Sequence, residues 1–507
     1  MKILMNTNQN NSKRGIFQIK IPDWEKPKSG KVRDNWIFSS ATQNYRMMIT
    51  TDRQSVDARY VATVPQKGMV SNLISEFWFN LTKDIVGNHL ISVPHPNVLL
   101  AKQAKLVFPI EIIIRRYLAK GNTPTSICYN YFTLQRRNIY GIDFPNSLQI
   151  DDELPMGNII TPTTKAKDGH DEELSQKQAE KIVDKLSQAG TWDKIKKASE
   201  QIFERARLHC LDKGIILADT KFEFGIDEDG ELMIIDELLT PECSRYWYAD
   251  SYLQLKKEKK NQLPNKDALV DWLEKNNEWQ KGEIPNIDPT IVDQMTAVSV
   301  DLFTRITGQD LKYTKADTEK IKNIAMECKW SVLIPDRCVK YLSGLSNEKA
   351  QRIVKISSWN KLGNKISDTI IQKIKSVIPN IPLQLMGSQV LKISGQRDLD
   401  ITGTTNSDSF VKYKQLLEPI FGKVNSMNNS SIVWHFHESG YEVAIYIVAP
   451  SKSDQFERQK QTNKILLKNP DLLKEYEQLK LSLNGKTYLK YQEEKFKFFH
   501  KIDSLRG

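Results

Sequence analysis

The sequence predicts an α+β protein of more than one domain, and three observations support this class. A chain of 507 residues exceeds what one ordinary hydrophobic core holds, so two or three domains are expected. A hydrophobic share of 39% is typical of a folded chain. Segments with the two-residue period of strands alternate with segments that have the helical period of 3.6 residues.

The first part of the chain mixes short strands with helices. Residues 1–14 are polar and are predicted to be a flexible N-terminus. β-rich runs are predicted at 15–21, 45–51, 58–64 and 97–118, and helices at 71–87, 175–190, 191–214 and 288–308. Ser175 and Thr191 are cap-type residues at the starts of two of these helices. A strand over 215–225, a turn at Asp229-Gly230 and a strand over 231–240 form a predicted hairpin.

The pattern changes after residue 311. Residues 312–377 are mostly helical in period, strands return at 383–393, 431–438 and 441–449, and the chain beyond 469 is helical. We therefore expect a first domain over 15–311, a helical connecting segment over 312–380 and a second domain over 381–507.

Composition limits the classes of function. No run of about 18 apolar residues suggests a membrane span, and the N-terminus has no signal-peptide core, so a cytoplasmic protein is expected. The five Cys are odd in number and form no CxxC pair, which fits free thiols in a reducing compartment. The net charge of +11 suggests anionic partners, but a solvated Lys-rich surface explains it equally well.

One charged constellation stands on the predicted hairpin. Asp219, Lys221 and Glu223 alternate along an apolar strand and therefore share a face, and the second strand brings Asp236 and Glu237 alongside. Clustered carboxylates repel unless a cation joins them, and oxygen ligands of this kind suit Mg²⁺ held together with nucleotide phosphates. The alternative is a solvent-facing charged ladder on an edge strand.

Three further segments indicate the same chemistry. Ser29, Gly30 and Lys31 form a turn whose backbone and Lys could approach a phosphate, although such turns are common. Arg115 ends a buried strand and suits carboxylate or phosphate, unless it only pairs with a core carboxylate. The loop 161–173 carries Lys165, His170 and Asp171, as active-site loops and solvated loops both do.

Together these segments resemble the SAICAR synthetase family of purine biosynthesis over about residues 12–310. The matching strings are SGKVRD, TTDRQSVD, QKGMVSNLISEFWFN, PIEIIIRRYLAKG, TPTTKAKDGHDEE, GIILADTKFEFG and IDELLTPECSRYW. The resemblance implies a two-lobed ATP-binding fold and an ATP- and Mg²⁺-dependent ligase. Such a ligase joins carboxyaminoimidazole ribotide (CAIR) to L-aspartate and releases SAICAR, ADP and phosphate.

The resemblance also implies roles for the matching residues. Metal would be held by Glu223 and Asp236, and the nucleotide by Ser29, Gly30, Lys31 and Glu237. The residues facing the reaction would be Lys165, Lys221 and Asp219, with Asp219 orienting Lys221. Substrate would be bound by Ser55, Asp57, Arg115, Asn122, His170, Asp171, Ser244 and Arg245.

Three positions around the expected substrate rim depart from the family pattern. Asn122 stands where the family has Ser, and Glu242 and Cys243 stand where Asp and Ser are usual. These departures permit an alternative hypothesis, in which the chain is a SAICAR-synthetase paralogue. Such a paralogue would join a related carboxylate to an amino acid in a specialised nucleotide or nucleoside pathway.

The second predicted domain carries its own constellation. Gly387 and Ser388 precede Asp398 and Asp400 at the spacing of polymerase-β-like nucleotidyltransferases, and Glu442 on a later strand is the candidate third carboxylate. The alternative is a turn followed by an acidic strand end. The C-terminal helices and the strand WHFHE, with His435 and His437, resemble GrpB-type proteins, which implies an α/β nucleotidyltransferase fold.

Several hypotheses for the whole chain stay open. The chain could combine a ligase with a nucleotidyl-transferring domain, or a ligase with a non-catalytic module that binds a nucleotide or mediates assembly. A nucleic-acid-binding protein is a third class, but no nucleic-acid motif supports it. The expected partners are small molecules, namely CAIR or an analogue, L-aspartate and ATP, without a membrane, and an oligomer is compatible with the sequence.

Overall fold

The chain divides into two compact units, Met1–Lys329 and Trp330–Gly507. The computed structural model describes residues 15–21, 24–39, 43–56, 59–166, 171–258, 269, 272–273, 275, 285–312, 317–450 and 453–503. The sequence places the boundary near 311, whereas helix α7 (Thr318–Leu333) carries the boundary in the structure. Lys329 on this helix lies 4.8 Å from the Trp24 ring and 5.1 Å from the Phe38 ring, so most of α7 belongs to the first unit.

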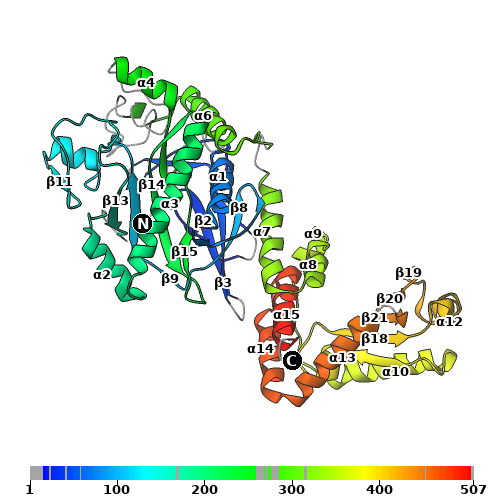
Figure 1. Ribbon diagram of the computed structural model, residues 1–507. Helices are drawn as coiled ribbons and strands as arrows, with labels where there is room; N and C mark the ends of the chain where they lie inside the picture. The colour runs from blue at the N-terminus through cyan, green and yellow to red at the C-terminus, as the bar shows by residue number, and fades with distance from the viewer. Residues whose placement is uncertain are drawn as a thin grey trace. The chain divides into compact units, whose positions relative to one another are not determined.

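The first unit contains two main sheets (Figure 1). One has the strand order β1-β2-β3-β8-β7, and these strands are Lys28–Ser29, Arg33–Ser39, Asn44–Thr50, Val98–Lys102 and Leu90–His95. The other has the order β13-β10-β14-β15-β6, with strands Ile159–Thr164, Ile110–Arg115, Ile215–Ile226, Leu232–Ile235 and Gly87–Asn88. β16 (Ser244–Tyr248) and β9 (Leu106–Val107) also pair with β14. Two small hairpins join β4 (Arg53–Val56) to β5 (Arg59–Thr63) and β11 (Asn138–Ile139) to β12 (Ile142–Asp143).

Helices cover one side of the second sheet and build the main core. They are α1 (Lys67–Thr82), α2 (Gln176–Leu186), α3 (Thr191–Asp212) and α6 (Pro289–Thr307), while α4 (Ala249–Glu258) follows β16 and the short π-helix η2 spans Tyr129–Thr133. α3 packs along β14, and Phe222 and Phe224 of that strand are fully buried in the shared core (Figure 1). The apolar side of β14 therefore anchors the strand, and its charged side is left to face the other sheet.

Several predicted elements are confirmed, with shifted ends. The hairpin turn at Asp229-Gly230 forms, and α2 begins with a capping box in which Ser175 accepts from the Gln178 amide. α6 ends at Gly308, whose φ of 69° is left-handed. α1 ends at Thr82 instead of 87, because Gly87–Asn88 pair as strand β6 with β15.

Three local predictions are wrong. Residues 15–21 form no strand, although Ile16, Ile19 and Ile21 are buried, because their apolar side chains pack without a ladder partner. Thr191 is not the N-cap of α3: Gly190 is, and the Thr191 hydroxyl donates 2.8 Å to the Gln188 carbonyl instead. The strand predicted over 231–240 stops at Ile235.

The second unit is built on a five-stranded sheet with the order β17-β18-β21-β20-β19 (Figure 1). The strands are Leu383–Met386, Asp398–Thr404, Tyr441–Val448, Ser431–Glu438 and Ser426–Asn428, and only β18 and β21 run parallel. α10 (Lys361–Val377), α12 (Phe410–Phe421) and the single 3-10 turn η3 (Ser407–Ser409) accompany this sheet, with α10 and α12 on its apolar face. The region expected as a connecting segment therefore contributes α10 to the core of the second unit.

The remaining helices of this unit form a second cluster. They are α8 (Asp336–Ser343), α9 (Asn347–Gln351), α11 (Ser388–Leu391), α13 (Ser453–Lys468), α14 (Pro470–Ser482) and α15 (Tyr488–Asp503). Leu391, Leu466, Tyr476 and Phe498 share an apolar core that holds α11, α13, α14 and α15 together. None of the helices in the described parts of either unit is long and apolar enough to cross a bilayer.

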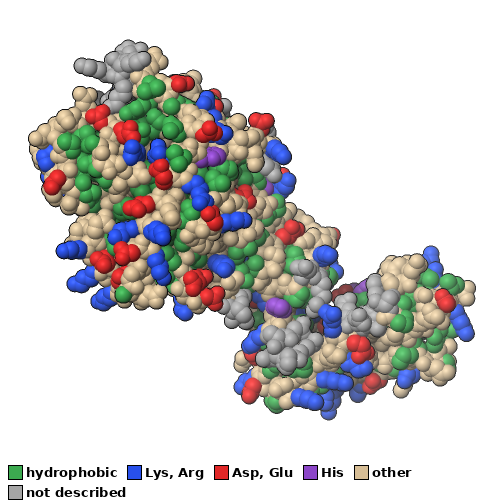
Figure 2. Space-filling model, in the orientation of Figure 1, with side chains coloured by type: hydrophobic (Ala, Val, Ile, Leu, Met, Phe, Trp, Pro, Cys, Tyr) green, Lys and Arg blue, Asp and Glu red, His purple; other side chains and the backbone are tan. Residues whose placement is uncertain are grey.

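Surface charge is mixed on the face shown in Figure 2. Lys and Arg side chains lie there interspersed with Asp and Glu, and no basic stripe is visible. This face therefore lacks the clustered basic footprint that is typical of a nucleic-acid-binding surface.

Candidate active site in the first unit and acidic site in the second

The charged face of β14 is set by strand register. Asp219 lies opposite Arg115 of β10 and Arg245 of β16, and Glu223 lies opposite Ile235 at the end of β15. Paired residues in a sheet share a face. The register therefore collects the charged residues of three strands, β10, β14 and β16, on one surface, as the sequence predicts for Asp219, Lys221 and Glu223.

Asp219 binds two arginines. Its Oδ2 accepts from Arg115 Nη1 at 3.2 Å and from Arg245 Nη1, and Arg115 also donates to Thr161 Oγ1 at 3.0 Å. Asp219 is 3% exposed, so this is a buried carboxylate shared by two guanidinium groups. The implied role of Asp219 in orienting Lys221 is not what the contacts show: Asp219 positions the two arginines.

Lys221 is oriented by a different carboxylate. Its Nζ lies 2.7 Å from Glu111 Oε1 and 3.5 Å from Glu223 Oε1. Burial by itself lowers the pKa of Lys221, but Glu111 and Glu223 outweigh burial and raise it above its usual range. Lys165 forms an ion pair with the other oxygen of Glu223, so one carboxylate joins both lysines.

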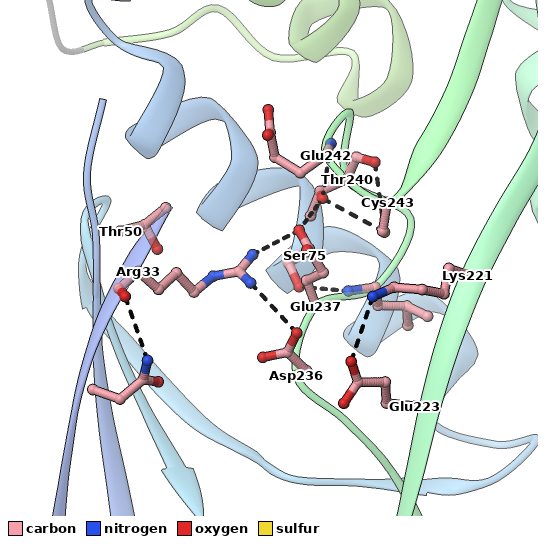
Figure 3. Close-up of polar contacts among 12 residues, drawn as sticks. Arg33, Thr50, Ser75, Lys221, Glu223, Asp236, Glu237, Thr240, Glu242 and Cys243 are labelled. Atoms are coloured by element: carbon pink, nitrogen blue, oxygen red, sulfur yellow. Dashed lines mark hydrogen bonds and ion pairs between the residues drawn. The ribbon is translucent and has the colours of Figure 1, made fainter. Parts of the chain in front are cut away.

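Asp236 stands directly after β15 in an unusual backbone conformation. Its φ is 66°, a left-handed value that is uncommon outside Gly, and it ends the strand there. Asp236 Oδ2 lies 3.8 Å from Arg33 Nη1, and Arg33 Nη2 donates to Glu237 Oε2 at 2.8 Å (Figure 3). Arg33 comes from β2, so this contact joins the two sheets of the first unit.

The two carboxylates of Glu223 and Asp236 have opposite electrostatic environments. Burial raises the pKa of Glu223, and the nearby Asp236 raises it further. Burial alone would also raise the pKa of Asp236, but nearby cations, Arg33 foremost, lower it to about 2. A divalent cation between them would relieve their repulsion, so the donor set fits Mg²⁺.

These two carboxylates do not form a complete metal site by themselves. Among the described residues, no group of three or more His, Cys, Asp or Glu has the geometry of a metal site. Mg²⁺ commonly keeps waters and takes one or two carboxylates together with substrate phosphates. The pair Glu223 and Asp236 therefore fits a metal that arrives with a nucleotide.

The turn at Ser29, Gly30 and Lys31 is exposed, and a buried side chain holds its backbone by hydrogen bonds. The buried Arg53 side chain donates to the Gly30 carbonyl at 3.2 Å and to the Lys31 carbonyl at 3.4 Å. The same guanidinium binds Asp34 Oδ1 at 2.8 Å. The buried ion pair holds the turn in place, which suits a loop that approaches a phosphate.

The other predicted residues lie in varied settings. Ser244 is 8% exposed, and its hydroxyl lies 2.7 Å from the Thr220 hydroxyl. One carboxylate oxygen of Asp171 accepts a hydrogen bond from the Ala166 amide at 2.7 Å, so it stabilises the loop itself. Ser55 is half-buried on β4, and Asn122 is exposed. Asp57 and His170 lie outside the described residues.

Two residues of the site were missed in the sequence. Glu111 interrupts an apolar run in "FPIEIIIRR", and an acid inside such a run is a detectable signal. Arg33 lies within the motif SGKVRD, but its partners Asp236 and Glu237 lie far away in the sequence. The contact between Arg33 and Glu237 joins residues that are 204 positions apart. No local pattern could have revealed that contact.

Glu237 is tightly held in this network. Its Oε2 accepts from both Arg33 and the Thr240 hydroxyl (Figure 3). Cys243 lies beside Thr240, 3.6 Å from the hydroxyl to Sγ, and burial raises the pKa of its thiol to about 12. Cys243 is therefore a neutral packing residue rather than a reactive thiol.

The predicted acidic residues of the second unit also share a face. Asp398 and Asp400 lie two residues apart on β18, and Asp398 pairs with Glu442 of the parallel strand β21. His437 and His435 of β20 lie opposite Glu442 and Ala444, so they occupy the same face, away from the apolar core. A Cβ on Gly387 would lie 3.5 Å from Asp400 Oδ2, which places the Gly387-Ser388 turn beside the acids.

Comparisons with known proteins match the first unit. The family model described as SAICAR synthetase matches residues 26–286. A phosphoribosylaminoimidazole-succinocarboxamide synthase of Legionella pneumophila (strain Paris) is 35% identical over 300 residues, which cover 59% of this chain and 92% of that protein. The solved SAICAR synthase of Saccharomyces cerevisiae complexed with SAICAR is 26% identical, with a TM-score of 0.49, and covers 59% of this chain and 100% of its own.

One comparison concerns a smaller protein. The crystal structure of conserved protein GrpB from Enterococcus faecalis covers 30% of this chain and 95% of its own, at 14% identity and a TM-score of 0.26. A likeness of that size supports no statement about the second unit.

Proposed function

The chain belongs to the SAICAR synthetase family of ligases, and from this premise we propose that its first unit is an ATP- and Mg²⁺-dependent amide ligase. It would condense CAIR with L-aspartate to SAICAR, ADP and phosphate. The observation that carries the proposal is the cluster of Glu223 and Lys221 on β14 with Asp236 directly after the paired strand β15, where Lys165 and Arg33 also contact the two carboxylates.

Glu223 and Asp236 would hold the metal together with nucleotide phosphates. Bound there, Mg²⁺ would neutralise phosphate charge and make the terminal phosphoryl group a better electrophile. The anchored backbone of Ser29, Gly30 and Lys31 would lie along the phosphates. Glu237, fixed by Arg33 and Thr240, would keep the nucleotide end of the site rigid.

The arginines explain how an anionic substrate would be bound. Asp219 holds Arg115 and Arg245 in place, and guanidinium groups are suited to binding a carboxylate or a phosphate. Ser244 lies next to Arg245 on β16 and would contribute its hydroxyl. Asp219 is thus a positioning residue, and the two arginines are the binding groups.

The chemistry requires the lysines. A carboxylate oxygen of the substrate attacks the terminal phosphorus of ATP, ADP leaves, and a mixed acyl phosphate forms. The amine of aspartate then attacks the carbonyl carbon, phosphate leaves, and the amine loses a proton. Lys221 and Lys165 would stabilise the negative charge at both steps, and Glu111 keeps Lys221 protonated and in place.

The proposal is tested with the purified full chain. CAIR, L-aspartate, ATP and Mg²⁺ should yield SAICAR and ADP in equal amounts by mass-resolved products, and omission of any one should stop the reaction. Glu223→Gln should remove activity, whereas Lys194→Met, an exposed change on α3, should not. A protein that hydrolyses or ignores these substrates under all conditions would sink the proposal.

A specific observation favours the paralogue as a second candidate. Asn122, at the family's Ser position, is exposed, while the buried Ser126 hydroxyl donates to the Gly121 carbonyl at 3.0 Å and lies against Gly121 near Arg245. The hydroxyl next to Gly121 at this rim is therefore that of Ser126, which supports a changed substrate anion. A higher kcat/KM for another imidazole or heterocyclic carboxylate than for CAIR would support this candidate, and efficient turnover of CAIR would exclude it.

For the second unit we propose a nucleotidyltransferase-type domain of the GrpB kind. The support is the position of Asp398, Asp400 and Glu442 on one sheet face beside the Gly387-Ser388 turn. Either the domain transfers a nucleotidyl group or it binds a nucleotide without transferring it. Asp398→Asn together with Asp400→Asn distinguishes these outcomes, because only a catalytic domain loses nucleotide transfer.

A further inference from the structure

Tyr140 occupies a backbone position that tyrosine rarely takes. Together with Gly141 it forms the two-residue turn between β11 and β12, and its φ is 57°. Asn, Asp or Gly usually takes this left-handed position, because a bulky side chain is strained there. Tyr140 is nevertheless only 3% exposed and packs in a small core of the first unit. A strained residue persists where its surroundings hold it, and such residues cluster at functional sites.

The hydroxyl of Tyr140 joins two parts of the expected substrate rim. It donates to the Thr125 carbonyl at 2.9 Å, and a side-chain hydrogen bond also connects it with Arg115. Burial raises the pKa of Tyr140 to about 12, so the hydroxyl stays protonated at ordinary pH. A protonated phenol can donate to the carbonyl and accept from the guanidinium at the same time.

The loop 121–126 thereby meets both arginines of the expected anion site. One end of the loop is joined to Arg115 through Tyr140. At the other end, a Cβ added to Gly121 would lie 3.7 Å from Arg245 Nη2. Without the Tyr140 hydroxyl, the loop could shift relative to the two guanidinium groups.

The turn that carries Tyr140 is itself fixed. Glu173 Oε1 accepts from the Tyr140 amide at 2.7 Å, and the other oxygen of Glu173 accepts from Arg136 at 3.0 Å. Backbone and side chain of Tyr140 are therefore both held by groups outside the turn. An arrangement of this kind suits a residue that keeps two neighbouring groups in a set geometry.

We propose that Tyr140 is a positioning residue of the ligase. Its hydroxyl fixes the loop 121–126 against Arg115 and thereby sets how tightly the anionic group of the substrate is bound. The inference rests on the proposed ligase function, and it adds a residue that acts through Arg115 without touching the substrate.

Steady-state kinetics of Tyr140→Phe in the full chain provide the first test. This change keeps the ring and removes only the hydroxyl. KM for CAIR should rise by about 5- to 20-fold, because the loop and Arg115 are no longer joined. We expect kcat, and KM for ATP and for L-aspartate, to stay within about 2-fold of wild type.

Tyr131→Phe is the matched control. Tyr131 is 2% exposed in the same core, and its hydroxyl donates to the Pro145 carbonyl at 2.6 Å. The control therefore loses a similar buried hydrogen bond and should keep the KM of wild type. An equal rise of KM in both variants would overturn the inference. Faster hydrogen exchange throughout residues 117–154 in Tyr140→Phe alone would also overturn it, since Tyr140 would then be a structural residue.

A double-mutant cycle tests the route through Arg115. Arg115→Lys removes the guanidinium that Tyr140 binds, so adding Tyr140→Phe should raise KM for CAIR by less than about 2-fold. Full additivity of the two changes would overturn the inference. The riboside of CAIR, which lacks the phosphate, identifies the bound anion. If Tyr140→Phe has no effect with the riboside, the anion is the phosphate, and if the effect remains, it is the carboxylate.

Titration calorimetry with CAIR in the absence of ATP separates this inference from the proposed activity. Weaker binding to Tyr140→Phe than to a wild-type chain that shows no turnover would support the inference and reject the activity. Turnover with unchanged affinity and KM in Tyr140→Phe would reject the inference alone. A wild-type chain that neither binds nor converts CAIR would reject both.

Discussion

The two units each carry a pair of acids on a sheet, but with opposite electrostatic surroundings. In the first unit, Glu223 pairs with Lys165 and Lys221, and Asp236 with Arg33. In the second unit, neither Asp398 nor Asp400 has an ion pair within the described residues, although Lys480 and Lys495 both attract Asp398 electrostatically. The acids of the first site are neutralised by direct ion pairs, whereas those of the second are only partly balanced, by lysines that form no ion pair with them.

The consequence is visible in two aspartates. Nearby cations lower the pKa of Asp236 to about 2, whereas burial and then Asp398 raise the pKa of Asp400 to about 7. The same side chain is thus stabilised as an anion in one unit and destabilised in the other. An internally balanced cluster is suited to positioning substrates during a reaction, and an unbalanced one gains most from a ligand that brings charge of its own.

Removing a cation from the balanced site should have the largest effect. Lys221→Met removes a charge proposed to act in both chemical steps and leaves Glu111 and Glu223 facing each other. We expect kcat/KM for amide formation to fall by about 100- to 1000-fold. Steady-state SAICAR formation measures it, with Lys213→Met, an exposed lysine next to α3, as the control. Near-normal rates would show that Lys221 has no part in the chemistry.

Neutralising one aspartate in each unit should give stability changes of opposite sign. At pH 7 without divalent cations, Asp400→Asn should stabilise the second unit by roughly 1–3 kcal/mol, and Asp236→Asn should destabilise the first by about 1–2 kcal/mol. Exchange rates of peptides in each unit report the two separately, since a two-unit chain need not unfold in one step. Changes of the same sign would refute the contrast.

The two units should also respond differently to pH. The folded second unit binds a proton at Asp400 that the unfolded chain releases above its ordinary pKa of 3.8, so its stability should fall as pH rises from about 4 to 7. Asp236 contributes stability above pH 3.8 that is lost only as pH falls toward 2. In Asp400→Asn the pH slope of the second unit should flatten, which exchange measured at pH 5 and 7 would reveal.

The smallest effect is expected at the substrate rim. Asn122→Ser restores the family's residue at an exposed position of the expected substrate rim. Although its neighbour Gly121 lies near Arg245, Asn122 itself is exposed at the rim. We expect a change of about 2- to 5-fold in KM for CAIR, with kcat nearly unchanged, since the residue would bind substrate without taking part in the chemistry. A large fall in kcat would place Asn122 in the chemistry instead.

Much of the fold could be predicted from local patterns. Strand β14, helix α6 and strands β20 and β21 follow from periodicity and from caps such as Asp288 and Gly308, because these signals lie within one segment. The end of β15 could not be predicted, since the left-handed conformation of Asp236 has no signal in the largely apolar run over 231–240. The irregular path of residues 15–21 likewise depends on having no neighbouring strand.

The sequence by itself determined the two-part α+β organisation, the charged face of β14 and the acids of β18, because alternation assigns side chains to faces without knowledge of the fold. Only the tertiary structure decided the partners of those charges. Arg33 meets Glu237 across two sheets, Asp219 holds two arginines rather than Lys221, and Lys480 comes to rest beside Ser388 and Gly395. Each of these contacts joins residues far apart in the chain. They depend on how the strands and helices pack, which a local sequence pattern does not determine.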